Sequence, residues 1–242
     1  MASRVVPVTS PVQVQAPTPD GARAPDLIST VAAGAGQSGA RRPGPGPRCA
    51  RCPRLVELRG TRRREYPNDW NRPVPAAGPA DARILIVGLA PGAQGANRTG
   101  VPFCGDSSGD TLREAMRATG LMPDRVRITN VVKCLPPGNR PTGDEVRNCA
   151  SWFVRELRDL ERTGGGVVVA LGRVAHTAVV RELGARQVDM PFRHGAVYDA
   201  GSRGVLIDSY HCSQYNTSTR RLTPAMLRRV LRCAARLAGE HQ

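Results

Sequence analysis

Residues 84–106 read Ile84-Leu-Ile-Val-Gly-Leu-Ala-Pro-Gly-Ala-Gln-Gly-Ala-Asn-Arg-Thr-Gly-Val-Pro-Phe-Cys-Gly-Asp106, and they indicate the architecture of the chain. The apolar start, 84–87, is typical of a buried parallel strand. The loop after it is rich in glycine, alanine and proline, which opens its backbone N–H groups at the carboxyl edge of a sheet, where α/β folds bind ligands. The loop runs for 19 residues from Gly88 to Asp106. That is long for an ordinary strand–helix connection and indicates a functional role.

Apolar runs and amphipathic segments alternate along the rest of the chain. Strands are predicted at 83–88, 126–132, 167–171 and 204–210. Helices are predicted at about 108–118, 142–161, 174–183 and 224–237. The second helix opens with a capping box, Thr142-Gly-Asp-Glu145. The alternation predicts an α/β fold of three layers, α/β/α, around a central, mainly parallel four-stranded sheet.

Residues 1–48 differ in composition from the rest: they are rich in Pro, Gly, Ala and Ser and contain no aromatic residue. Such a segment buries too little apolar surface to offset its ordering entropy. We therefore predict a disordered tail over 1–48 and a single domain over 49–242. The chain shows no signal peptide and no apolar run of about 18 residues that would span a membrane. We expect a cytoplasmic protein that works at the bacterial nucleoid.

The net charge is +15, and +12 of it lies in residues 49–242. Lys133 is the only lysine, so nearly all of the positive charge is carried by guanidinium groups. Guanidinium binds phosphate in a bidentate manner and stacks on aromatic rings. A basic excess of this size indicates an anionic partner, with nucleic acid as the first choice.

Four of the seven cysteines are placed to bind one metal centre. Cys49-Ala-Arg-Cys52 has the spacing of a knuckle that gives two thiolates to a metal. Cys134, at a strand end, and Cys149, near a helix start, are the best candidates for the second pair. Four thiolates serve zinc or an iron–sulfur cluster, and the spacing alone leaves both open. The alternative is that Cys134 and Cys149 are small core residues.

The loops after the second and fourth predicted strands carry the other polar candidates. Asn139 offers an amide donor and acceptor, as needed to read a base edge, although a turn-forming asparagine is the simpler interpretation. His211 leaves a buried strand beside hydroxyl and guanidinium groups, so we interpret it as functional. The groups of this loop that suit phosphate contacts are Ser213, Thr217, Thr219, Arg220 and Arg221.

Together the three loops resemble the uracil-DNA glycosylase superfamily, and most closely its family 5, the B-type enzymes with an iron–sulfur cluster. The first loop is similar to that family's Gly-Leu-Ala-Pro-Gly-Ala-x-Gly-Ala-Asn-Arg-Thr-Gly-x-x-Phe-x-Gly-Asp pattern. Residues 132–142 are similar to its Val-x-Cys-x-Pro-Pro-x-Asn-x-Pro-Thr segment. Residues 211–219 are similar to its His-x-Ser-Gln-x-Asn-Thr-x-Thr segment, and Arg-Leu-Thr follows at 221–223. The resemblance covers about 49–237.

The resemblance implies an enzyme that binds double-stranded DNA as a monomer with no obligate protein partner. It implies hydrolytic removal of uracil, hypoxanthine and xanthine from a flipped-out nucleotide, which leaves an abasic site. The implied base-binding groups are Gly88, Leu89, Ala90, Gly92 and Phe103. The implied ligands of a [4Fe–4S] cluster are Cys49, Cys52, Cys134 and Cys149.

Three residues receive catalytic roles in this hypothesis. His211 stabilises the departing base anion through a hydrogen bond. Asp106 stabilises the cationic sugar or orients the attacking water, and Asn139 positions the base or the water. Because Lys133 precedes a proposed cluster ligand, no lysine is available as a Schiff-base nucleophile. The reaction is therefore predicted to release the base without cleaving the strand.

Leu89 favours family 5 over the other branches, which carry a polar or acidic catalytic side chain at this position. Two positions depart from the family's pattern: Cys212 stands where many relatives have proline, and Arg220 where they often have glycine. If residue 220 needs a positive φ, arginine costs roughly 1 kcal/mol there.

Two other functions remain open. The first is a non-catalytic nucleic-acid-binding module with a structural metal, which explains the charge and the cysteines but gives the long first loop no role. The second is a hydrolase of free nucleosides or nucleotides, which could use the same loops but does not need the basic charge.

Overall fold

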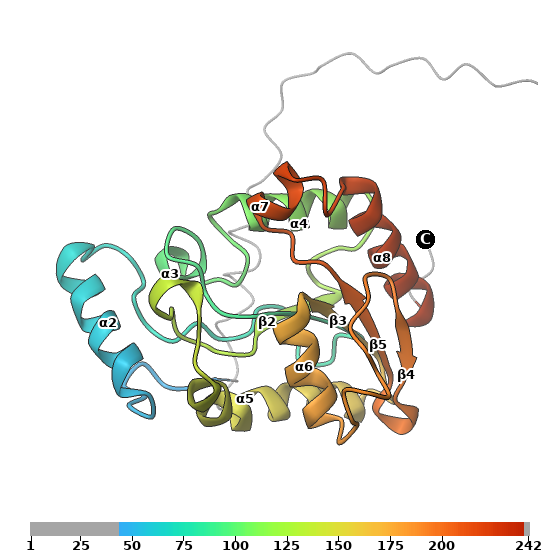
Figure 1. Ribbon diagram of the computed structural model, residues 1–242, viewed down its shortest axis with the longest axis horizontal. Helices are drawn as coiled ribbons and strands as arrows, with labels where there is room; N and C mark the ends of the chain where they lie inside the picture. Colours follow the sequence, from blue (N-terminus) through green and yellow to red (C-terminus); the bar gives the residue numbers. More distant parts are fainter. Residues whose placement is uncertain (1–43, 240–242) are drawn as a thin grey trace, which may run out of the picture.

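A computed structural model describes residues 44–239 (Figure 1). Its strands are β1 Ile84–Gly88, β2 Val126–Asn130, β3 Val167–Leu171, β4 Val197–Asp199 and β5 Val205–Ser209. Its α-helices are α2 Pro53–Glu65, α3 Ala96–Thr99, α4 Ser107–Arg117, α5 Gly143–Arg162, α6 Arg173–Glu182, α7 Gln214–Ser218 and α8 Pro224–Leu237. Two 3₁₀ turns, η1 and η2, cover Pro137–Asn139 and Gly201–Arg203.

The strands form one sheet in the order β2-β1-β3-β5-β4. β1, β2, β3 and β5 pair in parallel, while β4 pairs antiparallel with β5 at the edge. The predicted mainly parallel sheet is confirmed, but the predicted count of four strands is wrong. β4 escaped prediction because it is three residues long and lacks a buried apolar face; Val197 is 47% exposed.

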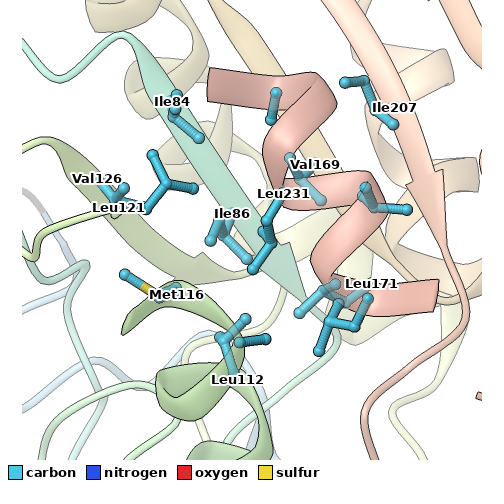
Figure 2. Close-up of a cluster of buried hydrophobic side chains, with 14 of the residues drawn as sticks. Ile84, Ile86, Leu112, Met116, Leu121, Val126, Val169, Leu171, Ile207 and Leu231 are labelled. Atoms are coloured by element: carbon cyan, nitrogen blue, oxygen red, sulfur yellow. The ribbon is translucent and has the colours of Figure 1, made fainter. Parts of the chain in front are cut away.

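Helices cover both faces of the sheet, which confirms the three layers: α4 and α8 lie on one face, α5 and α6 on the other (Figure 1). Successive residues of β1 point to opposite faces, so Ile84 and Ile86 enter one core while Leu85 and Val87 enter the other. Figure 2 shows the first core, where Leu231 of α8 and side chains of α4 pack against the sheet. A strand buried on both faces explains the unbroken apolar run.

The predicted elements match the observed ones closely at most ends. α8 begins and ends as predicted, and the capping box of α5 forms, with Glu145 N–H donating to Thr142 Oγ1. The second strand ends at Asn130 rather than at residue 132. The helices α2, α3 and α7 were not predicted. α2 has no apolar periodicity to reveal it, because Leu55 is its only buried residue.

Residues 44–48 precede α2 and form a turn in which the Cys49 N–H donates to the Gly46 carbonyl at 3.0 Å. Residues 1–43, which make up most of the predicted tail, lie outside the described residues. The division into a tail and one domain therefore stays a prediction. Within 44–239, every helix is too short or too polar to cross a membrane.

Candidate active site and thiol cavity

The first loop folds back on the end of β1, so that an aromatic ring lies against the strand end. A Cβ atom at Gly88 would lie 2.6 Å from Phe103 Cε2 and 2.4 Å from Asn130 Oδ1, so only glycine lets both side chains approach. Phe103 has φ +51°, a left-handed conformation that non-glycine residues seldom adopt. Arg113 fixes this turn by donating to the Phe103 carbonyl at 2.8 Å. A ring and an amide therefore lie together at the carboxyl edge of the sheet.

Asp106 is held in one orientation at the same edge. It is the N-cap of α4, and its Oδ1 accepts a hydrogen bond from the Gly109 N–H at 2.9 Å. Its Oδ2 lies against the first loop, where a Cβ atom at Gly95 would be 2.2 Å away and one at Gly92 3.2 Å away. The helix N-terminus favours the negative charge of this carboxylate. The first loop therefore supplies the Asp106 carboxylate, and its glycines at 92 and 95 leave room for that carboxylate.

His211 follows β5 and reaches the same place. Its ring centroid lies 5.8 Å from that of Phe103. Burial lowers the pKa of His211 below its ordinary 6.5, and the nearby Asp106 carboxylate opposes that shift only in part. The imidazole is therefore neutral at pH 7, with one ring nitrogen that carries a hydrogen. Its backbone is fixed by Asn216 Nδ2, which donates to the His211 carbonyl at 2.8 Å.

Cys212 tethers the third loop to a neighbouring helix. Its side chain is fully buried, and its thiol donates to the Ser108 carbonyl of α4 across 3.4 Å. Burial raises the pKa of this thiol to about 12, so it stays protonated and remains a donor. The bond joins the histidine loop to the helix that Asp106 caps.

The third loop continues into α7. Ser213 caps this helix by accepting from the Asn216 N–H at 3.4 Å. Thr217 and Thr219 turn their hydroxyl hydrogens toward carbonyls of the same helix. Each hydroxyl oxygen remains a possible acceptor, while the hydrogens are already engaged within the loop.

Two arginines and two tyrosines complete this surface. Arg220 has φ +58°, so the arginine does occupy a left-handed position. The Arg221 guanidinium lies over the Tyr210 ring, 4.7 Å from its centroid. Tyr215 projects from α7 with 73% of its surface exposed. An exposed aromatic ring thus stands four residues after His211, flanked by positive charge.

No hydrogen bond within residues 44–239 joins the Asn139 side chain to these groups. It is exposed on η1 with φ +57°, as expected of a turn-forming asparagine. Asn130 is the amide that the structure places beside Phe103. Sequence reasoning missed it because it closes an apolar strand, although a polar residue at a strand's carboxyl end is itself a signal. Leu89 and Ala90 are half-buried directly after β1.

The Lys133 side chain is held by a buried ion pair with Glu156 and not by groups of this site. Its Nζ lies 2.8 and 2.7 Å from the two carboxylate oxygens of Glu156, and both side chains are almost fully buried. Nζ also donates to Thr129 Oγ1. A charged amine held in a buried ion pair is no free nucleophile.

The four predicted cysteines gather around one cavity, which we call the thiol cavity. Cys49 and Cys52 enter it from the start of α2, Cys134 from the segment after β2, and Cys149 from α5. Apolar walls are supplied by Leu55, Val56 and Val132. These positions lie far apart in the sequence, so the convergence comes from the fold.

The four thiols are shielded from water and lie close enough that their charged thiolate forms would repel one another. Burial, and next the neighbouring Cys149, raise the pKa of Cys134 to about 12. Burial likewise raises the pKa values of Cys149 and Cys52. N–H donors already face two sulfurs: the Lys133 amide lies 3.4 Å from Cys149 Sγ, and Asn148 Nδ2 lies 3.6 Å from Cys52 Sγ.

Nowhere in 44–239 do three such ligands stand close enough to hold a single metal ion. A cubane cluster differs from a single ion because each cysteine binds a different iron, so its thiolates stand further apart. Four thiols around one cavity, with N–H donors toward sulfur, fit a [4Fe–4S] group better than one zinc ion.

Comparison with known proteins identifies the family of the chain. A model of the Uracil DNA glycosylase superfamily matches residues 75–234. The chain is 45% identical over 208 residues to the type-5 uracil-DNA glycosylase of Thermus thermophilus, and the aligned region covers 79% of this chain and 94% of that protein. It is 46% identical over 208 residues to the type-5 enzyme of Pyrobaculum aerophilum, covering 79% and 89%. A type-4 uracil-DNA glycosylase from Archaeoglobus fulgidus is 37% identical over 142 residues, covering 57% and 69%. The chain belongs to the uracil DNA glycosylase superfamily.

Proposed function

We propose that this protein is a monofunctional DNA glycosylase that hydrolyses the bond between uracil and deoxyribose in double-stranded DNA. The observation that carries the proposal is the meeting of Phe103, Asp106 and His211 at one sheet edge. They supply a ring for the base, a carboxylate for the sugar and a neutral donor for the leaving group. The relatives named as uracil-DNA glycosylases support this substrate.

The base is held by a ring and by polar edges. Phe103 stacks on it, and the backbone of Gly88, Leu89, Ala90 and Gly92 binds its rim. We assign the base-reading amide to Asn130, because its Oδ1 lies beside Gly88 and Phe103. Asn139 serves the site only if the loop that carries it moves toward the base.

The leaving group is stabilised by His211. As the C–N bond stretches, the base becomes anionic, and a neutral imidazole donates a hydrogen bond to its carbonyl oxygen. Such preorganised donors contribute ~10²–10³ in rate. The lowered pKa of His211 supports this role, because it favours the neutral imidazole, which carries an N–H to donate to the base.

The sugar is served by Asp106. Its carboxylate is fixed by the Gly109 N–H, and it either stabilises the cationic sugar or orients the water that attacks it. The buried Lys133–Glu156 pair leaves no lysine for Schiff-base chemistry, so the strand is not cut by β-elimination.

The third loop binds the DNA backbone. Its phosphate contacts are assigned to Ser213, Thr217, Thr219, Arg220 and Arg221. The two threonine hydroxyls donate to phosphate after rotating away from the backbone carbonyls that they face in the free protein. Flipping a base leaves a gap in the stack, and Tyr215, exposed on α7, is the ring that fills it. A wedge of this kind is needed on duplex and dispensable on single strands.

The substrate range extends to hypoxanthine and xanthine. One stacking ring, backbone groups and a single side-chain amide discriminate weakly between planar bases, whereas a rigid array of several side-chain donors would be selective. Flipping is cheapest at mismatched bases, so selection rests partly on the weakness of the damaged pair.

Cys49, Cys52, Cys134 and Cys149 hold a [4Fe–4S] cluster in the thiol cavity. The bound group supplies a structural cross-link rather than a step of the reaction. Its ligands tie the start of α2 to the end of β2 and to α5. The enzyme is expected to work as a monomer in the cytoplasm.

The test uses end-labelled duplexes that carry one uracil, hypoxanthine, xanthine or normal base, incubated with the full chain and then treated with alkali. Breaks that appear only after alkali, and only in damaged duplexes, are expected. Asp106→Asn and His211→Ala are each expected to slow the single-turnover rate at least tenfold. Intact strands throughout, from folded protein that binds DNA, would overturn the enzymatic proposal in favour of a binding module.

A further inference from the structure

Two buried N–H groups at the thiol cavity have no partner within residues 44–239. They are Arg59 Nη1 and Trp152 Nε1, and both residues line the cavity. An unpaired buried donor loses its hydrogen bonds to water without replacing them, and a charged one loses more, so native proteins rarely leave one unmatched. Two such donors at one cavity indicate that the cavity's occupant accepts hydrogen bonds.

Arg59 is already anchored to the cysteine knuckle. Its other nitrogen, Nη2, donates to the Cys49 carbonyl at 2.9 Å. No Asp or Glu within 44–239 forms an ion pair with Arg59, although other arginines of α2 have carboxylate partners. A half-buried cation without a carboxylate partner thus lines the same cavity as the four cysteines.

Trp152 approaches the cavity from α5, one turn after Cys149. Guanidinium carbons lie near the ring, with Arg51 at 5.6 Å and Arg155 at 5.0 Å from its centroid. These cation–π contacts hold the indole in place. The indole N–H is a donor with no acceptor function, so it needs an acceptor in the cavity.

We propose that Arg59 Nη1 and Trp152 Nε1 donate hydrogen bonds to the sulfur atoms of the iron–sulfur cluster, with Arg59 as its charge partner. The inference rests on the proposed cofactor. A cluster ligated by four thiolates is anionic and presents sulfur acceptors, so it satisfies both orphaned donors at once. The Lys133 amide, after β2, and Asn148 Nδ2, on α5, already donate toward cysteine sulfurs. With Arg59 and Trp152, donors therefore face the cluster from α2, from α5 and from the segment after β2.

Two properties follow for the bound cluster. Hydrogen bonds to the sulfurs and a nearby positive charge stabilise the more negative, reduced form, so both donors raise the reduction potential. They also shield the sulfurs and slow the release of iron.

The experiment compares wild type with Arg59→Met, Arg59→Lys and Trp152→Phe, all as purified holoprotein. Arg64→Met is the matched control, because Arg64 is exposed on the same helix and does not line the cavity. Iron and acid-labile sulfide are measured first. Resonance Raman spectra are then recorded after cluster assembly in H₂O and in D₂O, and cluster loss to an anaerobic iron chelator is timed.

Wild type and Arg64→Met are expected to show a deuterium shift of the Fe–S stretching bands. Arg59→Met and Trp152→Phe should each reduce that shift and lose the cluster several-fold faster. Arg59→Lys should fall between, because it keeps the charge and loses the planar fork. Full cluster content with an unchanged deuterium shift and loss rate in Arg59→Met and Trp152→Phe would overturn the inference alone. Wild type without iron and sulfide would overturn the proposed cofactor itself.

Discussion

Adding one methyl group at Gly95 tests the placement of the Asp106 carboxylate without changing any polar side chain. In Gly95→Ala the new Cβ would lie 2.2 Å from Asp106 Oδ2 and 2.6 Å from Cγ. Real Cβ contacts are essentially never shorter than 3.0 Å, so the carboxyl group must move by about 1 Å. A misplacement of about 1 Å costs roughly 10²-fold in rate, which corresponds to about 2.7 kcal/mol in the barrier.

Gly92 and Gly60 supply the matched controls. A Cβ at Gly92 would stand 3.2 Å from the same oxygen, so Gly92→Ala should lose less than tenfold. One at Gly60 would meet only Arg64 Nη1 at 3.8 Å, so Gly60→Ala should be neutral in rate. Single-turnover excision of uracil at saturating enzyme measures the chemical step, and DNA binding is measured separately and should not change.

The carboxylate also caps α4, so stability is followed in parallel by urea unfolding. Loss of the cap would cost about 1 kcal/mol, too little to unfold the enzyme. If folded Gly95→Ala excises uracil within threefold of wild type, the position of the Asp106 carboxylate does not control the reaction, and its assigned role is wrong.

Three further predictions concern the ion pair, the histidine and the strained arginine. Lys133→Met leaves the Glu156 carboxylate buried and unpaired, so it should lower the free energy of unfolding in urea by about 3–5 kcal/mol. The double variant Lys133→Met/Glu156→Leu should recover most of that loss; equal stability of the single variant and wild type would contradict this reasoning. NMR titration should give a His211 pKa below 6.5, and a still lower one in Asp106→Asn, because the carboxylate that favours the charged ring is gone. Arg220→Gly should stabilise the fold by about 1 kcal/mol and reduce the salt dependence of DNA binding by about one phosphate; a loss of stability would refute the strain.

The sheet was predictable because buried strands leave a strong signal. The strands at the centre are unbroken apolar runs, and the capped helices carry Thr142 and Thr223 at their starts. β4 and α2 left no such signal, since one is an exposed edge and the other buries only Leu55. Elements held by tertiary contacts rather than by their own periodicity are the ones that sequence reasoning loses.

The site was predictable to the level of loops and not of single side chains. Topology alone brings the loops after β1, β2 and β5 to one edge, so the meeting of Asp106 with His211 follows from strand order. The choice between Asn130 and Asn139 does not follow. It depends on where β2 ends. The predicted strand ended two residues too late, at residue 132, so Asn130 was taken for an interior strand residue and not for the residue at its carboxyl end.

The segment after β2 joins the base site to the thiol cavity within five residues. Asn130 faces Phe103, and the next two amides, Val131 and Val132, donate to the carbonyls of Gly88 and Leu89 at 3.0 Å each. Cys134 then enters the thiol cavity. Whatever holds Cys134 therefore also holds the backbone that supports the base-binding loop. A cluster bound in the thiol cavity, as proposed above, would therefore stiffen the strand end from which the base site is built without taking part in the hydrolysis.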